Sequence, residues 1–302
     1  MPTPKFDIIE ASFYFLSVFK RRPGACLWVL VWSCVPLVLV IFAMMQTLRS
    51  VAIGEAGALP QAFVPVFIVC WIALMGAMLS GYAAWLRLMV RDEVAPGIPL
   101  RFGADEWRLL GSMFAIFGVY LLVALGMMIV VAPGSLLSRG FEVGTPAHMA
   151  LNVLSVAIAF SLFIWFAVRA YPIYALSVLE RRVVGPSVWA ATKGVFWPVL
   201  ACLLILASAF LLMQLALGMT LAPLGAALSM GIDPEAVRTG NGWAQLGLLK
   251  ASLLTLISLV SFLLLLAMQA FALGPSAYIV LWNARRHAAA PPQQPDAAPP
   301  AP

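Results

Sequence analysis

Long apolar stretches separated by short polar segments run along the whole chain. Six of them have at least 22 residues each, and they cover about residues 25–48, 63–88, 110–132, 150–171, 195–221 and 250–274. A helix needs roughly 20 apolar residues to cross the hydrocarbon core of a bilayer, which is about 30 Å thick. The strands of a membrane β-barrel would alternate apolar and polar residues, and none of these stretches does so. The pattern therefore predicts an all-α fold with six transmembrane helices.

The composition supports the same class of protein. Of the 302 residues, 63% are hydrophobic and 10% are charged, and the mean hydropathy is +1.01. A soluble domain has about 25% charged residues, so this chain lacks the charge to cover a water-exposed surface of its size. Four cysteines are too few for a disulfide-stapled secreted scaffold of this length. We therefore predict a polytopic membrane protein.

Basic residues are distributed unevenly between the two sides of the predicted bundle. Fourteen of the 18 lysines and arginines fall in the N-terminus, the second-to-third and fourth-to-fifth connections, and the C-terminal tail. The other four, Arg49, Arg139, Arg238 and Lys250, fall on the opposite side. Cytoplasmic loops carry the excess of basic residues in membrane proteins, so we predict a bacterial cytoplasmic membrane protein with both termini in the cytoplasm. The net charge of +6 follows from this topology and does not indicate a nucleic-acid partner.

The second, fourth and sixth stretches end in a similar way. Near the end of each stretch, or directly after it, a glycine or proline is followed 10 or 11 positions later by an arginine: Gly81 and Arg91, Pro172 and Arg182, Pro275 and Arg286. Glycine and proline are common sites of helix bends, so we expect these helices to bend near the cytoplasmic interface and to continue beyond it. The spacing predicts three repeated units, over about residues 6–96, 97–186 and 187–287. Residues 288–302, rich in proline and alanine, are predicted to form a disordered cytoplasmic tail.

Each unit is predicted to consist of one interfacial helix followed by a hairpin of two spans. In residues 6–21, a polar stripe at helical spacing consists of Asp7, Glu10, Tyr14, Ser17 and Arg21, and apolar residues cover the other face. An amphipathic helix of this kind lies in the plane of the membrane interface. Residues 104–111 and 185–197 are the corresponding segments of the second and third units.

Residues that could carry catalysis do not converge along the sequence. The two histidines, His148 and His287, are predicted on opposite sides of the membrane, so they cannot share a metal ion. The four cysteines lie in apolar stretches, where a buried apolar role is expected. The 12 acidic residues fall in loops, interfacial segments or the tail. We therefore predict no enzymatic activity, no metal and no cofactor.

Two glutamines, Gln214 and Gln269, lie within the fifth and sixth stretches. Interhelical hydrogen bonding is their expected role. A transporter would need a central polar pathway at the middle of the membrane, and these glutamines with scattered serines and threonines provide little of one. The sequence therefore gives little support to ion-coupled transport.

Basic and aromatic residues cluster around the connection between the fourth and fifth stretches. Our hypothesis is that four cations contact lipid phosphate while two tryptophans anchor the helix between them; these residues are Arg169, Arg181, Arg182, Lys193, Trp189 and Trp197. A second interpretation places Glu180, with Arg169 and Lys193, around an interfacial polar site. The alternative to both is that the cations only fix the topology during insertion and that Arg169 extends its side chain to the interface.

The same region carries a family resemblance. Residues 168–204 contain, in this order, Arg169, Glu180, Gly185-Pro186, Thr192-Lys193-Gly194 and Phe196-Trp197. This order resembles the membrane domain attached to some bacterial glycerophosphoryl diester phosphodiesterases, although residues 187–191 lack the two basic residues of that family's short helix. The resemblance implies a six-span membrane domain. In the fused enzymes hydrolysis resides in a separate soluble domain with metal-binding acids, so the resemblance implies no catalysis by this chain.

The leading prediction for function is a non-enzymatic integral membrane protein that associates with lipids or organises the membrane. The alternative is a transporter of small molecules or lipids, and a membrane-embedded enzyme ranks third. Membrane lipids are the predicted partners, and the sequence identifies no protein partner.

Overall fold

The computed structural model describes residues 5–53, 63–95, 97–138, 145–185, 188–229 and 247–289, and within them it is all-helical with no strand. Six helices are long and apolar enough to cross a membrane: α3 (Pro23–Ile53), α4 (Phe63–Leu86), α5 (Ala104–Ser138), α6 (Pro146–Ala170), α9 (Phe196–Ser229) and α12 (Gly247–Ala289). The shorter elements are α1 (Ile8–Ser12), α2 (Tyr14–Arg21), the π-helix η1 (Arg87–Arg91), α7 (Ile173–Glu180) and α8 (Val188–Ala191). The predicted all-α fold with six membrane-spanning helices is confirmed.

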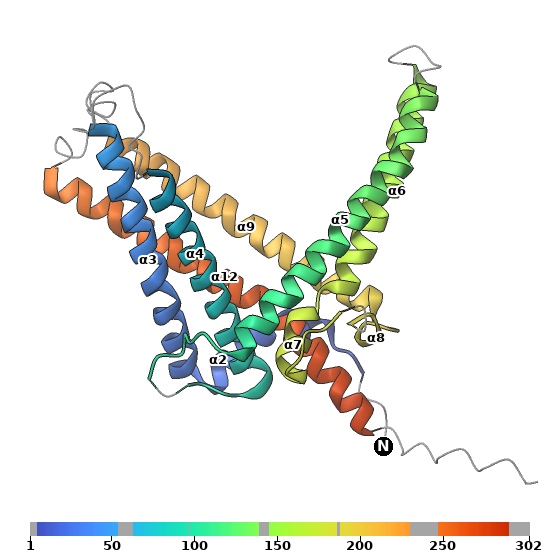
Figure 1. Ribbon diagram of the computed structural model, residues 1–302, viewed down its shortest axis with the longest axis horizontal. Helices are drawn as coiled ribbons and strands as arrows, with labels where there is room; N and C mark the ends of the chain where they lie inside the picture. Colours follow the sequence, from blue (N-terminus) through green and yellow to red (C-terminus); the bar gives the residue numbers. More distant parts are fainter. Residues whose placement is uncertain are drawn as a thin grey trace, which may run out of the picture.

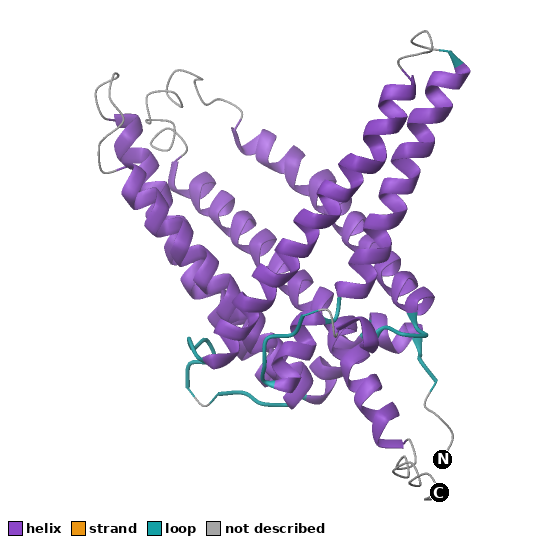
Figure 2. Cartoon of the chain, turned by 45° about the vertical axis from the view of Figure 1, so that its right-hand side comes forward, coloured by secondary structure: helices purple, strands orange, loops and turns teal. Residues whose placement is uncertain are grey.

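The long helices rise from a common base, which we define as the end of the molecule that holds α1, α2, η1, α7, α8 and the C-terminal end of α12 (Figure 1, Figure 2). α5 and α6 pack against each other and diverge from α3 and α4 toward the opposite end (Figure 1). α12 is the central helix, in contact with both N-terminal helices and with α3, α4, α7 and α9. Its spanning segment is 56% buried, whereas that of α5 is 6% buried. The exposed apolar surface of α5 is suited to contact with lipid.

The hydrophobic core lies at the base. Its fully buried members include Leu86, Leu88, Val178, Ile279 and Val280, which come from α4, η1, α7 and α12. Elements from the first, second and last hairpins therefore share one core. This core fixes the position of the short helices from which the polar sites are built.

The N-terminal segment forms two short helices, separated at Phe13, where a single interfacial helix is predicted. Asp7 caps α1 by accepting two backbone N–H bonds from the first turn, at 2.8 and 3.0 Å. The predicted polar stripe is wrong at Tyr14, which is buried and whose hydroxyl donates to the Met89 carbonyl at 3.2 Å. The predicted apolar residues Ile9, Phe13, Leu16 and Phe19 remain exposed. The segment thus docks on the protein through Ala11, Ser12, Tyr14 and Val18, with Ile8 and Phe15 packed against the core, and leaves part of its apolar surface outward.

The three predicted bends have different outcomes. α4 continues through Gly81 and changes to the π-helix η1 only at Arg87. The fourth span breaks as predicted, because α6 ends at Ala170 and α7 begins at Ile173, directly after a proline that cannot donate a backbone hydrogen bond. α12 continues through Pro275 without ending. It runs to Ala289, so the first two residues of the predicted tail are helical, and the rest of that tail lies outside the described residues.

The predicted interfacial segments of the second and third units also differ from expectation. Residues 104–111 are not a separate helix but the first two turns of α5, because nothing in that stretch except a single glycine interrupts helix formation. Of the described residues of the third segment, four form the short helix α8 and the last two, Phe196 and Trp197, begin α9. The helix that packs against the third hairpin is α1 of the first unit, which contacts both α9 and α12. The threefold repeat stays a prediction.

Candidate functional site

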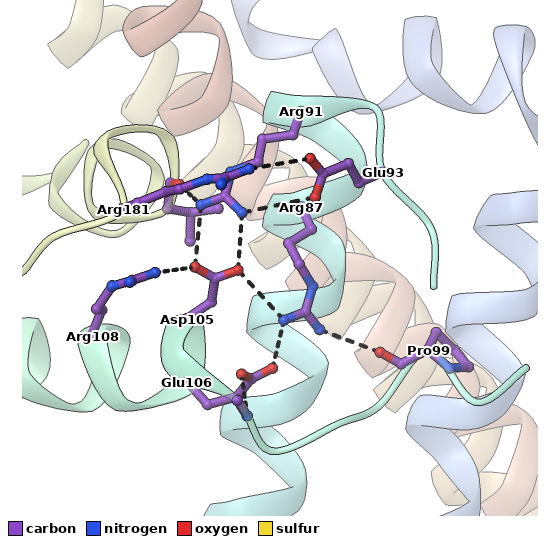
Figure 3. Close-up of polar contacts among 10 residues, drawn as sticks. Arg87, Arg91, Glu93, Pro99, Asp105, Glu106, Arg108 and Arg181 are labelled. Atoms are coloured by element: carbon purple, nitrogen blue, oxygen red, sulfur yellow. Dashed lines mark hydrogen bonds and ion pairs between the residues drawn. The ribbon is translucent and has the colours of Figure 1, made fainter. Parts of the chain in front are cut away.

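A network of charged side chains lies inside the base, where η1, α5 and α7 meet (Figure 3). Arg87 and Arg91 stand at the two ends of η1, and both reach the first turn of α5. Arg91 forms a two-pronged ion pair with Asp105, with nitrogen–oxygen distances of 3.0 and 3.1 Å. Arg87 pairs with Glu106 at 2.7 Å. Two neighbouring ion pairs therefore join α5 to the end of the second span.

Glu106 is held by both of its carboxylate oxygens. One oxygen accepts from Arg87, and the other accepts the backbone N–H of Gly103 at 2.8 Å, directly before α5 begins. A glutamate in the first turn that reaches back to the preceding N–H satisfies one of the donors that a helix start leaves open. Arg87 also donates to the Pro99 carbonyl at 3.3 Å. The connection from η1 to α5 is thus tied to the same two side chains.

Asp105 accepts from a second arginine as well. Arg108, one turn further along α5, donates to it at 2.9 Å. Arg91, in turn, donates to the backbone carbonyl of Val178 in α7. The network therefore links three elements, η1, α5 and α7, that belong to two different hairpins.

The network is deeply buried. Arg87 is 4% exposed and Glu106 is 0% exposed. Removing one partner of a buried ion pair leaves an uncompensated charge and costs about 3–5 kcal/mol, whereas the intact pair has a small net effect compared with well-packed apolar residues. The arrangement specifies how the hairpins meet, and its cations are already neutralised by carboxylates from the same chain.

This network is the functional feature that reasoning from the sequence missed. In the sequence, Arg87 and Arg91 are two of the cations that set the predicted topology, and Asp105 and Glu106 are two of the acidic residues of loops and interfacial segments. One pattern in the sequence could have indicated the network. Two arginines four positions apart at the end of a span are followed by two adjacent acids at the start of the next helix. Nothing in the sequence shows that the connection between them folds back so closely.

A second polar arrangement lies where α6, α8 and α9 meet, and it contains the predicted residue Arg169. One nitrogen of the Arg169 guanidinium donates to the Trp189 carbonyl at 3.3 Å and to the Thr192 hydroxyl at 3.2 Å. Its central carbon lies 5.9 Å from the ring centroids of both Trp165 and Phe196. None of these partners is negatively charged. In the part of the chain that the structure describes, Arg169 forms no ion pair, and its buried Nε has no hydrogen-bond partner.

Exposed residues surround this arginine. Lys193 follows Thr192 directly, in a turn closed by Gly194 at a φ of +83°, and it is exposed with no ion-pair partner among the described residues. The positive φ suits glycine, which has no Cβ. Trp189 is 38% exposed and Trp197 is 74% exposed. The structure therefore brings Arg169, Lys193 and the two predicted tryptophans to one part of the base.

The other predicted site residues lie at the C-terminal end of α7 and point elsewhere. Arg182 pairs with Glu180 at 2.6 Å, and Arg181 reaches Glu93 at 3.7 Å. All of these side chains are at least one-third exposed. Within the described residues, Glu180 forms an ion pair with neither Arg169 nor Lys193. The structure thus does not bring together the three residues of the predicted interfacial polar site.

The chemistry of the two arrangements differs. The charges of the buried network are paired within the chain, although the Arg91 Nε has no hydrogen-bond partner among the described residues. Arg169 and Lys193 find no carboxylate among those residues and are therefore suited to bind an anion. Over the described residues, no three histidine, cysteine or acidic side chains are grouped so that they could hold a metal ion. Comparison of the chain with models of protein families, with curated proteins and with solved structures found no match.

Proposed function

We propose that this chain is a non-enzymatic protein of a bacterial cytoplasmic membrane that binds the headgroups of anionic lipids at its base. The observation that carries the proposal is Arg169, a cation at the end of a spanning helix whose polar partners, Trp189 and Thr192, are neutral. Lys193 adds a second charge next to these partners. A lipid phosphate provides the negative oxygens that neither cation finds among the described residues.

The aromatic residues around Arg169 support the same proposal. Trp165, Trp189 and Trp197 are all exposed. Tryptophan is enriched at the boundary between headgroups and hydrocarbon, where its ring is apolar and its N–H is polar. An anion bound by Arg169 and Lys193 would lie at the same depth as these rings, and that is the depth of lipid phosphates.

The proposal includes an orientation. If the base faces the cytoplasm, as the distribution of basic residues predicts, then both termini are cytoplasmic. Reporter fusions near residues 55, 140 and 238 should be extracytoplasmic, and fusions near residues 95, 185 and 290 should be cytoplasmic. One reversed connection would overturn the orientation, because the basic residues of all the connections together support it.

We further propose that the chain is related to the membrane domains of glycerophosphoryl diester phosphodiesterases and is built from three repeated units. The residues that support the relationship are the motif residues of 168–204, and two of them, Arg169 and Lys193, belong to the proposed lipid site. The proposed relationship extends to the membrane domain alone and implies no hydrolase activity.

The lipid proposal is tested by a double variant, Arg169→Gln with Lys193→Gln. The protein is purified from vesicles that contain phosphatidylglycerol, and the lipid that remains bound is quantified by native mass spectrometry. Each cation near an anionic lipid contributes about 1 kcal/mol, so the double variant should retain roughly thirtyfold less phosphatidylglycerol. High salt should reproduce part of the loss in the unmodified protein by screening.

A matched control is Arg139→Gln, which removes one positive charge from the side predicted to be extracytoplasmic. It should leave the retained phosphatidylglycerol unchanged. Equal retention by the double variant and this control would overturn the proposal and leave the cations with a role in topology alone.

A further inference from the structure

A cavity lies between α3, α4 and α12, away from both charged sites. Its volume is about 20 Å³, which is room for one water-sized group. Leu266 and other apolar residues form part of the lining, and four side chains with polar atoms complete it: Ser33, Tyr82, Trp85 and Gln269. Among the residues that the structure describes, no charged side chain lines the cavity. The three helices contact one another, and Figure 1 shows them together.

The polar groups of the lining offer both donors and acceptors to an occupant. The Ser33 hydroxyl donates to the Val29 carbonyl at 2.7 Å, which leaves its oxygen able to accept. Among the described residues, the Tyr82 hydroxyl, the Trp85 indole N–H and the Gln269 amide form no hydrogen bond within the chain. None of the three is a fully buried polar atom without a partner, so each is accessible to an occupant of the cavity or to the surroundings. Trp85 is itself buried, with 4% of its surface exposed. Several hydrogen-bonding groups therefore surround a space that the protein leaves empty.

The depth of the cavity makes these groups costly to leave unpaired. Ser33 is ten residues into α3, about 15 Å along the helix at a rise of 1.5 Å per residue, and Tyr82 comes five residues before the buried Arg87. The cavity thus lies in the half of the spanning region nearest the base. An unsatisfied polar group surrounded by hydrocarbon is strongly unfavourable, which favours an occupant that can hydrogen-bond. Because the lining carries no charge, that occupant is neutral.

Exposed apolar surface continues from the cavity along the same helix faces. Met75 lies one turn before Met78, which lines the cavity, and Leu265 lies one turn before Gln269. Both Met75 and Leu265 are exposed. A molecule with a polar oxygen in the cavity could therefore extend an acyl chain over these residues.

We propose that the cavity binds one neutral oxygen-bearing group, a hydroxyl or an ester carbonyl, of a membrane lipid. The site differs from the anionic-headgroup site in chemistry and in place, and it does not depend on that proposal. Binding here uses hydrogen bonds from uncharged groups, so it should be insensitive to salt, whereas binding at Arg169 should weaken as salt is raised.

The experiment uses the full chain in phosphatidylethanolamine vesicles with a photoactivatable diacylglycerol, which is neutral and carries one hydroxyl and two ester carbonyls. After illumination, labelled residues are identified by mass spectrometry. We expect labelling around Met75 and Leu265. The double variant Tyr82→Phe with Gln269→Leu removes two hydrogen-bonding groups and should reduce this labelling about fivefold or more.

The matched control is Gln214→Leu, which makes the same substitution at an exposed glutamine of α9. It should leave labelling around Met75 and Leu265 unchanged. Gly81→Ala provides a variant that keeps the fold, because the added Cβ would lie 3.5 Å from the Ser33 hydroxyl, an ordinary contact. That methyl narrows the cavity and should also reduce labelling several-fold.

Three outcomes would overturn the proposal. Labelling near the cavity no stronger than on the exposed face of α9 would mean that the cavity holds water alone. Labelling unchanged by the double variant and by Gly81→Ala would mean that the probe contacts the helices without entering. Labelling that appears only with a phosphatidylglycerol probe and disappears in salt would assign the contact to charged headgroups.

Discussion

Two arginines near the base ends of spanning helices, Arg87 and Arg169, have opposite surroundings. Arg87 is buried, contacts two carboxylates at 2.7 and 3.8 Å, and donates to a backbone carbonyl. Arg169 is partly buried and contacts a carbonyl, a hydroxyl and two aromatic rings, with no carboxylate among the described residues. Both lie near the ends of even-numbered spans, where a basic residue also contributes to the predicted topology.

The difference shows how a basic residue at a membrane interface can serve either the fold or a ligand. The charge of Arg87 is neutralised within the chain, so its contribution is to hold α5 against the end of the second span. Among the described residues, Arg169 contacts only neutral groups, so its charge is able to attract an anion from outside the chain. Each of the following variants tests one side of this comparison.

The largest effect is expected for Arg87→Gln. This change leaves Glu106, which is fully buried, without its ion-pair partner. Because a buried unpaired charge costs about 3–5 kcal/mol, the free energy of unfolding should fall by that amount. The measurement is unfolding of the detergent-solubilised protein by sodium dodecyl sulfate, followed by circular dichroism.

Two further variants test whether the loss of stability in Arg87→Gln comes from the unpaired charge of Glu106. Arg87→Met combined with Glu106→Leu removes both charges and should recover most of the lost stability. Arg22→Gln breaks an ion pair of 2.8 Å with Asp92 that is about half exposed, and it should cost less than about 1 kcal/mol. If the double variant were as unstable as Arg87→Gln alone, the loss would come from packing and not from the unpaired charge.

A smaller effect is expected for Arg169→Gln, and on a different measurement. Glutamine can still donate to the neutral groups around it, so the free energy of unfolding should change by about 1 kcal/mol or less. Retention of phosphatidylglycerol should fall about fivefold, because one cation near the anionic lipid is lost. Arg169→Lys keeps the charge and should restore most of the retention. A loss of stability as large as that of Arg87→Gln would remove the distinction between the two arginines.

The smallest effect is expected for the double variant Arg181→Gln with Arg182→Gln. Both side chains are exposed and face the carboxylates Glu93 and Glu180, so their charges are already partly neutralised. We expect the six-span topology to persist, unfolding to change by less than about 1 kcal/mol, and phosphatidylglycerol retention to fall less than with Arg169→Gln. Retention lower than in Arg169→Gln would place the lipid site at α7, contrary to the comparison.

The class of fold and the number of spanning helices could be predicted from the amino-acid sequence. A run of more than 20 apolar residues satisfies its backbone hydrogen bonds as a helix and finds a favourable solvent in lipid, and neither property depends on the rest of the chain. The same local logic placed a break at Tyr171-Pro172. It also identified Arg169 and Lys193 as residues of interest, since cations and tryptophans gather at membrane interfaces.

The role of each polar residue, in contrast, follows from the packing of helices that are distant in the sequence. Whether an arginine meets a carboxylate depends on how two helices approach, and apolar periodicity gives no information about the path of the connection between η1 and α5. The same limit hid the docking of Tyr14 on Met89 and the cavity that gathers Ser33, Tyr82 and Gln269 from three helices. Local chemistry fixes which segments are helices, because it acts over a few residues. Contacts between distant segments fix which charges are neutralised and which polar groups are left open, because those outcomes depend on distances that sequence spacing does not set.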